Sequence, residues 1–222
     1  MVEDGPLPLP DSPKLRRAAE LFEQAVHETL ELMRAGGAVR ETRPAPGAIS
    51  YEFPPAPEHI RLVLGDCFQS LRSALDHEVY SLSAASHGSQ WADRANTAFP
   101  LAPNEHVFRS QGRKQIRGLS SAAQTLVETL QPFQQPQHPI VPLLVFVHDV
   151  ARVDRHRLLN LAALQPRSVQ VQHATGRIGL SVELRFVMSE FSGRDALGAA
   201  KQAIGAIAWT IDGLRAADGS AP

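Results

Sequence analysis

Hydrophobic residues recur at spacings of three and four along five stretches of the chain, and this period predicts five helices. The helices are expected over residues 14–35, 57–83, 120–130, 140–161 and 196–216. The second stretch is the most regular and carries one continuous apolar stripe, which is typical of a buried core helix. The stripe consists of Leu64, Phe68, Leu71, Leu75 and Leu82. A polar loop is expected over residues 84–97, and one helical turn over residues 104–109.

The period changes from about 3.6 to two after Pro166, which indicates strands. Residues 169–173 and 178–187 alternate between apolar and polar positions around a tight turn, so they predict an antiparallel hairpin. Two more short strands are expected over residues 39–43 and 49–53. The fold class is therefore mainly α (α+β): a helical bundle of about five helices, with a small antiparallel β-sheet that includes a hairpin in the C-terminal half.

The chain of 222 residues is long enough to bury a full hydrophobic core, and no repeat or shift in composition marks a second domain. We therefore expect a single helical domain over residues 14–217. The acidic, proline-rich residues 1–13 are expected to form a flexible leader, and residues 218–222 a flexible tail.

Composition limits the classes of partner. Lys and Arg together number 22 and Asp and Glu number 23, so the net charge is close to zero. This argues against wholesale attraction to nucleic acid or anionic lipid and leaves a local basic patch open. The longest apolar run, residues 140–147, is far shorter than the roughly 20 residues that span a bilayer, so no membrane span is expected. The single cysteine, Cys67, fits a reducing cytoplasm and a buried structural thiol.

Two segments concentrate charged residues and histidines inside stretches that otherwise predict buried helix. They contribute Arg72, Asp76 and His77 from residues 71–77, and Asp154, Arg155 and His156 from residues 151–160. Buried charges without partners are costly, so these residues must be paired, functional or both. Arg72 and Asp76 are four residues apart, which allows an ion pair within one helix. In the second segment, Asp149, Arg152 and His156 share one helical face.

One interpretation of these residues is structural. Arg72 and Asp76 would face Asp154 and Arg155 where two core helices cross, and the complementary charges would fix the register of the helices. Such pairs contribute orientation more than net stability, because desolvation offsets most of the attraction. The protein would then be a non-enzymatic scaffold or interaction protein held by an interhelical salt-bridge network.

The other interpretation starts from a family resemblance carried by residues 65–160. The segments GDCFQSLRSALDHEVYSL, FPLAPNEHVF, LQPFQQPQHPI and VHDVARVDRHRLL are similar to a group of uncharacterised bacterial helical proteins. Their shared pattern is a helix with LRSALDH, a Phe-Pro loop, a Gln-Pro-aromatic turn and a helix with Asp, Lys or Arg, then His and Arg. This resemblance implies no particular activity.

A broader resemblance is to the HEPN superfamily of helical bundles, which is carried by Arg72 and His77. In that superfamily an arginine, four to six residues and a histidine mark a metal-independent RNA-cleaving site, often completed across a homodimer. The resemblance implies that His77 moves the 2′-hydroxyl proton and that Arg72 holds the scissile phosphate. Asp76, Asp154, Arg155 and His156 would support the site, with RNA as the partner. Whether the protein is an enzyme stays open at this stage.

Other chemistries receive less support from the sequence. The glycines are isolated and none opens a helix after a strand, so no nucleotide cofactor of the Rossmann or Walker type is expected. No DNA-binding signature is present in the sequence. No metal site is expected, although one assembled across helices from His77, His148, His156 and Asp76 is left open. A basic cluster of Arg109, Arg113, Lys114 and Arg117 is expected to be a solvated face, with anion or RNA backbone binding as the alternative.

Overall fold

The structure is a computed structural model. It describes residues 9–35, 40–45, 48–52, 56–156, 161–174, 177–188, 191 and 193–219. Among these, the backbone alone is described for residues 40–45, 48–52, 155–156, 161–174 and 177–186. The expected leader falls largely on residues 1–8 and the expected tail partly on residues 220–222, which lie outside the described residues.

The elements follow one another as helices interrupted by two pairs of strands. The order is α1 (Pro13–Arg34), β1 (Arg40–Ala45), β2 (Ala48–Glu52), α2 (Glu58–His87), α3 (Ser89–Ala95), α4 (Glu105–Val107), the π-helix η1 (Phe108–Gly112), α5 (Arg113–Gln115), α6 (Ser121–Thr129), α7 (Val141–His156), β3 (Leu161–Ala174), β4 (Arg177–Met188), β5 (Arg194–Asp195) and α8 (Ala196–Asp218). The molecule is mainly helical, as the sequence predicted.

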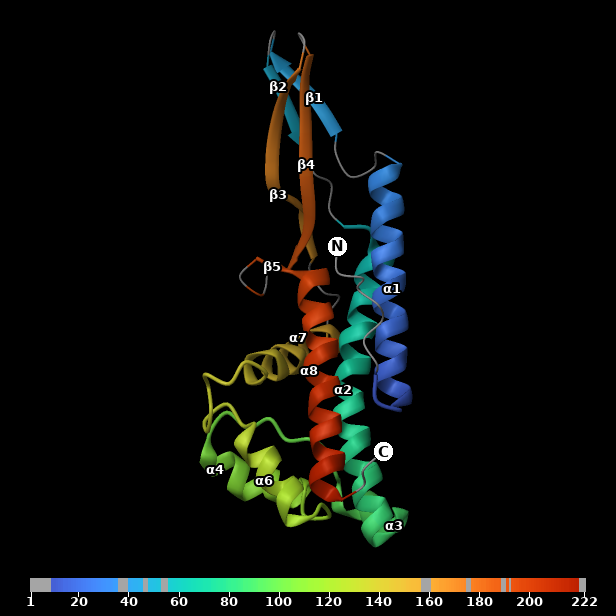
Figure 1. The fold of residues 1–222 in the computed structure, drawn as a ribbon, viewed down its shortest axis with the longest axis vertical. Helices are drawn as coiled ribbons and strands as arrows, with labels where there is room; N and C mark the ends of the chain where they lie inside the picture. The colour runs from blue at the N-terminus through green and yellow to red at the C-terminus, as the bar shows by residue number, and fades with distance from the viewer. Residues whose placement is uncertain are drawn as a thin grey trace.

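The long helices α1, α2 and α8 lie side by side along the long axis of the molecule (Figure 1). Helix α7 lies across α2 and α8, whereas α4 and α6 pack near one end and the strands extend from the other (Figure 1). Helix α2 is at the centre of this arrangement, since it packs against α1, α7 and α8. Its predicted apolar stripe is buried as expected, and Leu64, Phe68, Leu71 and Leu75 are fully buried.

The five predicted helices correspond to α1, α2, α6, α7 and α8. Helix α7 ends at His156 rather than at residue 161, because β3 begins at Leu161 and pairs with β4. The expected polar loop over residues 84–97 contains α3 instead, with Ala92 and Ala95 buried against the core. Asn96 ends this short helix in the left-handed conformation, with a φ of 52°.

The predicted hairpin is confirmed, and Ala174 pairs with Arg177 across its turn. The described strands form two separate sheets rather than one: β1 pairs with β2, while β3, β4 and β5 form the second sheet. Both sheets are antiparallel.

A buried ion pair ties the helical body together at one point along α2. Glu78, whose side chain is 4% exposed, accepts two hydrogen bonds of 2.8 Å from Arg215 of α8. Arg215 also donates to the backbone oxygen of Asp11, at 3.1 Å. The next residue, Ser12, is buried and accepts a bond from the Leu15 N–H at the start of α1. The chain entry into α1 is therefore fixed against α2 and α8.

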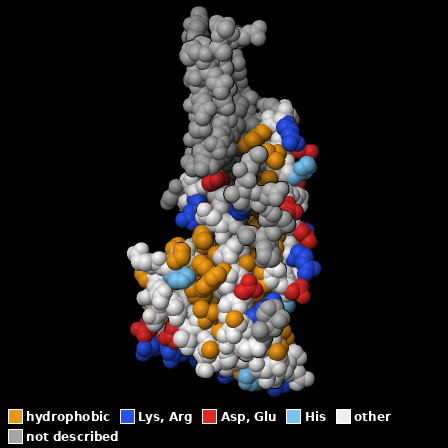
Figure 2. Space-filling model, viewed as in Figure 1, with side chains coloured by type: hydrophobic (Ala, Val, Ile, Leu, Met, Phe, Trp, Pro, Cys, Tyr) orange, Lys and Arg blue, Asp and Glu red, His pale blue; other side chains and the backbone are white. Residues whose placement is uncertain are grey.

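The surface differs between the two sides of the view in Figure 2. Charged side chains of both signs follow the edge formed by α1, while hydrophobic side chains gather over α7 and the middle of α8 (Figure 2). In the part of the chain that the structure describes, every helix is too short or too polar to cross a bilayer.

Candidate functional site

The site lies where α7 crosses α2. Residues of increasing number along α2 lie near residues of decreasing number along α7. The Asp154 carboxylate lies against Gly65, where a Cβ atom would come within 2.3 Å of Oδ1. One turn further along α2, the Gln69 side-chain amide donates to the Ala151 carbonyl. The absence of a side chain at position 65 thus allows the two helices to approach closely.

Arg72 and Asp76 follow on the same part of α2, and both bind the backbone of Phe99. Arg72 Nη2 lies 2.8 Å from Asp76 Oδ1 and donates to the Phe99 carbonyl at 2.6 Å. The Phe99 N–H donates to the same Asp76 oxygen at 2.9 Å. The ion pair predicted within the helix is therefore confirmed, and it also anchors the Phe-Pro loop that follows α3.

Gln131 holds this loop from the opposite side. Its side chain is fully buried; Oε1 accepts from the Ala102 N–H, and Nε2 donates to the carbonyl oxygens of Pro100 and Val127. A buried amide with all three bonds made is a rigid support, because losing any of them would leave a polar group unsatisfied. Residues 99–102 are thus clamped between α2 and the segment after α6.

His148 of α7 lies beside the residues just described. It lines a hollow of about 290 Å³ together with Arg72, Asp76, Ala151 and Arg152. The pKa of His148 is lowered from its ordinary value of 6.5, first by burial and then by the positive charge of Arg72. Asp149 and Asp76 act in the opposite direction, and Arg152 adds a further lowering that is smaller than the effect of Asp149. The imidazole is therefore neutral near pH 7 and is able to accept a proton.

His148 also lines a second hollow of about 290 Å³. It is lined by Leu101, Ala102, Pro103, Pro132, Val145, His148 and Asp149. Among the residues that the structure describes, the side chains of His148, Asp149 and Arg152 form no hydrogen bond or ion pair. Their polar atoms remain available to a ligand that enters either hollow.

The four segments on which the expectation of a bacterial family resemblance was based contribute residues near this place. LRSALDH supplies Arg72 and Asp76, the Phe-Pro loop supplies Phe99 and the residues after it, and the Gln-Pro turn supplies Gln131. The fourth segment supplies His148, which lines both hollows. A pattern distributed over residues 65–160 thus converges on one small volume.

Two of the other predicted site residues, His77 and Asp154, are not among the described residues that line the hollows. His77 is exposed on α2, 3.5 Å from Ser81 Oγ, and lines neither hollow. Asp154 lies at Gly65, seven residues before Arg72 and about two turns away along α2. The side chains of Arg155 and His156 lie outside the described residues, so the network expected between Arg155 and α2 stays a prediction.

His148 and Arg152 were not predicted as catalytic or supporting residues from the sequence, where His148 entered only as a member of a metal site left open and Arg152 only as part of one helical face. The available signal was their spacing: they are four residues apart and share one face of α7, directly after an apolar run. What the sequence did not reveal was that Arg72 would lie opposite this face, because that depends on how α7 crosses α2.

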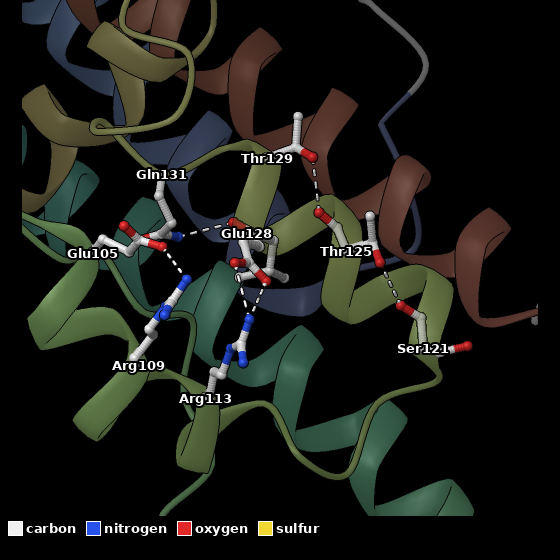
Figure 3. Close-up of polar contacts among 9 residues, drawn as sticks. Glu105, Arg109, Arg113, Ser121, Thr125, Glu128, Thr129 and Gln131 are labelled. Atoms are coloured by element: carbon white, nitrogen blue, oxygen red, sulfur yellow. Dashed lines mark hydrogen bonds and ion pairs between the residues drawn. The ribbon is translucent and has the colours of Figure 1, made fainter.

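The basic cluster near residue 110 is a face of surface ion pairs. Arg109 pairs with Glu105, and Arg113 forms two bonds of 3.1 Å with the Glu128 carboxylate (Figure 3). Arg117 lies over the Trp91 ring, 5.2 Å from its centroid. This agrees with the expectation of a solvated face, because acids or an aromatic ring already contact three of the four basic side chains.

Cys67 is buried, and its thiol donates to the Ala18 carbonyl at 3.3 Å. Burial raises its pKa to about 12, so the thiolate is not formed near neutral pH. The prediction of a structural thiol is confirmed. No group of three or more His, Cys, Asp or Glu side chains within the described residues is placed to hold a metal ion.

Comparison of the chain with protein-family models, with curated proteins and with solved structures found no match. Any functional conclusion therefore rests on the geometry of the two hollows.

Proposed function

We propose that the hollow around His148 binds a phosphodiester and that the protein cleaves RNA without a metal ion. The observation that carries this proposal is a neutral, half-buried imidazole that lines one open hollow together with two arginines. The HEPN resemblance motivates only the reaction class, because its sequence pattern is met by Arg72 with His77. We assign the histidine's role to His148 because His148, and not His77, lines the hollow with Arg72.

The charges in the hollow favour an anion. Asp76 offsets the charge of Arg72 at 2.8 Å, whereas Arg152 makes no ion pair with any described residue. Among the residues that line this hollow, Arg152 therefore supplies the positive charge that Asp76 does not offset, and it is exposed. Asp149 lines the second hollow and not this one. An arginine in this position suits a phosphate, since its planar donors bind two oxygens at once.

The reaction would proceed by internal transfer at the phosphate. His148 accepts the proton of the ribose 2′-hydroxyl, and the 2′-oxygen forms a bond to phosphorus. The bond from phosphorus to the 5′-oxygen breaks, and that oxygen takes a proton from water or from the protonated His148. The products are a 2′,3′-cyclic phosphate and a 5′-hydroxyl, while Arg152 and Arg72 stabilise the charge that develops on the phosphate.

A mixed RNA pool incubated with purified protein in EDTA tests this proposal. We expect the wild-type protein to release 2′,3′-cyclic phosphate ends, and His148→Ala to slow their release by about 10²- to 10⁴-fold. His77→Ala is the matched control and should cleave at the wild-type rate. Arg152→Ala should weaken RNA binding, whereas Arg94→Ala, which removes an exposed arginine of α3, should not.

Three results would contradict the proposal. If the wild-type protein releases no cyclic phosphate ends, the protein does not catalyse the proposed reaction. If His148→Ala still cleaves RNA, His148 is not the residue that accepts the proton. If His77→Ala loses cleavage and His148→Ala retains it, the proton acceptor is His77, as the sequence suggested.

The second candidate is the non-enzymatic scaffold, favoured by the way Arg72 and Asp76 bind the Phe99 backbone. Those bonds have the form of a structural clamp between α2 and the Phe-Pro loop. Under this alternative, Arg72→Ala lowers the melting temperature and His148→Ala leaves RNA untouched, as does the wild-type protein.

A further inference from the structure

The second hollow, which Pro103, Pro132 and Asp149 help to line, has a different chemistry from the first. Its walls are mostly apolar, and Asp149 is the one acid among the residues that line it. Asp149 and Val145 are four residues apart on α7, so they share the face that borders the hollow. With a volume near 290 Å³, the hollow lies at the small end of the range for ligand pockets, which suits one ring system.

The supports of this hollow are rigid. Residues 101–103 form one wall, and they follow Phe99, whose N–H is bound by Asp76. Gln131, the residue before Pro132, holds the backbone of Pro100 and Ala102 by hydrogen bonds. Two prolines and a clamped loop present flat, apolar surfaces that do not need to be ordered when a ring binds. The hollow is therefore preorganised for a planar group.

His148 lines both hollows, so a ligand that fills both passes beside its imidazole. In RNA, the ribose lies between its base and the 3′-phosphate. A phosphate beside Arg152 and a base beside Asp149 therefore place the ribose hydroxyl near His148, in agreement with the proposed reaction.

We propose, resting on the proposed function, that the hollow beside Asp149 binds the nucleobase on the 5′ side of the cleaved phosphate and selects guanine. An ionised carboxylate only accepts hydrogen bonds, and it accepts two at once from adjacent donors. Guanine presents two adjacent donors on its pairing edge, N1–H and the 2-amino group. Asp149 has no partner among the described residues that would compete for these bonds.

The other bases complement a carboxylate less well. Adenine and cytosine each place a ring nitrogen acceptor beside their amino group, and this lone pair repels the carboxylate. Uracil places carbonyl oxygens on both sides of its single N–H. A site with a carboxylate therefore discriminates against all three through unpaired or repelled groups.

Equilibrium binding of small ligands to the full-length protein tests the inference without requiring cleavage. The probes are guanosine 3′-phosphate, inosine 3′-phosphate, which lacks only the 2-amino group, guanosine and inorganic phosphate. We expect guanosine 3′-phosphate to bind at least about tenfold more tightly than inosine 3′-phosphate. Asp149→Asn should abolish this preference without abolishing phosphate binding, and the exposed-site control Asp66→Asn should preserve the preference.

The outcomes separate the inference from the proposed function. Equal binding of the guanosine and inosine nucleotides, or a preference that survives Asp149→Asn, overturns the guanine subsite even if phosphate binds and RNA is cleaved. Conversely, guanosine binding that depends on Asp149, without phosphate binding or RNA cleavage, supports the subsite and overturns the proposed function. Failure of every nucleoside and nucleotide to bind overturns the subsite.

Discussion

Helix α2 carries two charged regions six residues apart, and they use charge in different ways. At Glu78, the carboxylate is 4% exposed and makes two bonds of 2.8 Å to Arg215. At Arg72, the guanidinium is 13% exposed and lines an open hollow with His148 and Arg152. In the first region the charges satisfy one another, whereas in the second the side chains of His148 and Arg152 form no hydrogen bond or ion pair with any described residue. A buried ion pair whose groups are fully bonded to each other indicates that it stabilises the fold. A hollow lined by polar side chains that bond to no described residue indicates a place where a ligand binds.

The largest expected effect comes from breaking the closed region. Glu78→Ala removes a buried partner and leaves Arg215 without its carboxylate, so we expect a loss of about 3 kcal/mol in the free energy of unfolding. Binding of phosphate at His148 should be unchanged. Urea unfolding measures the stability, with the exposed Glu20→Ala as the control. A loss no larger than that of the control would show that the pair does not support the fold.

The next effect concerns the clamp beside the hollows. Gln131→Leu leaves the Ala102 N–H and the Pro100 carbonyl without their bonds, so we expect a loss of about 2 kcal/mol in stability. Unlike Glu78→Ala, it should also weaken nucleotide binding, because residues 101–103 form a wall of the second hollow. Chemical unfolding and ligand titration test both effects, with the exposed Gln24→Leu as the control. Unchanged nucleotide affinity would separate the clamp from the site.

A smaller effect is expected on the pH dependence of stability, and it comes from His148 in the open region rather than from the Glu78–Arg215 pair. The folded pKa of His148 is below its ordinary value, so acidification protonates this residue first in the unfolded chain. Its contribution to stability is therefore lost as the pH falls through about 6.5, the ordinary value. We expect stability to decline less between pH 7.5 and 5.5 in His148→Gln than in the wild type.

Urea unfolding at the two pH values measures this difference, with His106→Gln as a variant at an exposed position. The control should keep the wild-type decline. Identical declines in the wild type and His148→Gln would contradict the burial of this imidazole near two arginines.

The smallest effect is expected on the exposed face near residue 110. Arg113→Ala removes an ion pair whose arginine side chain is 54% exposed, and such pairs contribute about 0 to 1 kcal/mol. Neither stability nor RNA binding should change appreciably. Measured RNA affinity at low salt tests this, and a loss comparable to that of Arg152→Ala would make the exposed face a second binding surface.

The sequence predicted the helices well because their apolar periodicity is set locally. The stripe of α2 and the alternation around the turn between Ala174 and Arg177 are examples. The start of β3 at Leu161 was not predicted, since the apolar residues there fit either state and pairing with β4 decides it. Helix α3 was missed because it is short and follows Gly88 directly.

The candidate site was predicted only in part. Arg72 and Asp76 were found because an ion pair at four residues lies within one helix. Their partners were not, because the crossing of α2 and α7 decides that His148 rather than His77 shares the hollow of Arg72. The two helices cross where Gly65 allows the Asp154 side chain to come close to α2. The local pattern of apolar and polar residues does not predict such a contact.

The central claim is that His148 marks a phosphodiester site, and titration of the histidine resonances by NMR tests it most directly. The ligand is a 2′-deoxydinucleotide, which carries the phosphodiester without the attacking hydroxyl, and His148→Gln assigns the resonance. A bound anion stabilises the imidazolium, so the pKa of His148 should rise when the ligand saturates the protein, while the His77 resonance should not respond to the ligand. An unchanged pKa at His148, or a rise confined to His77, would contradict the account.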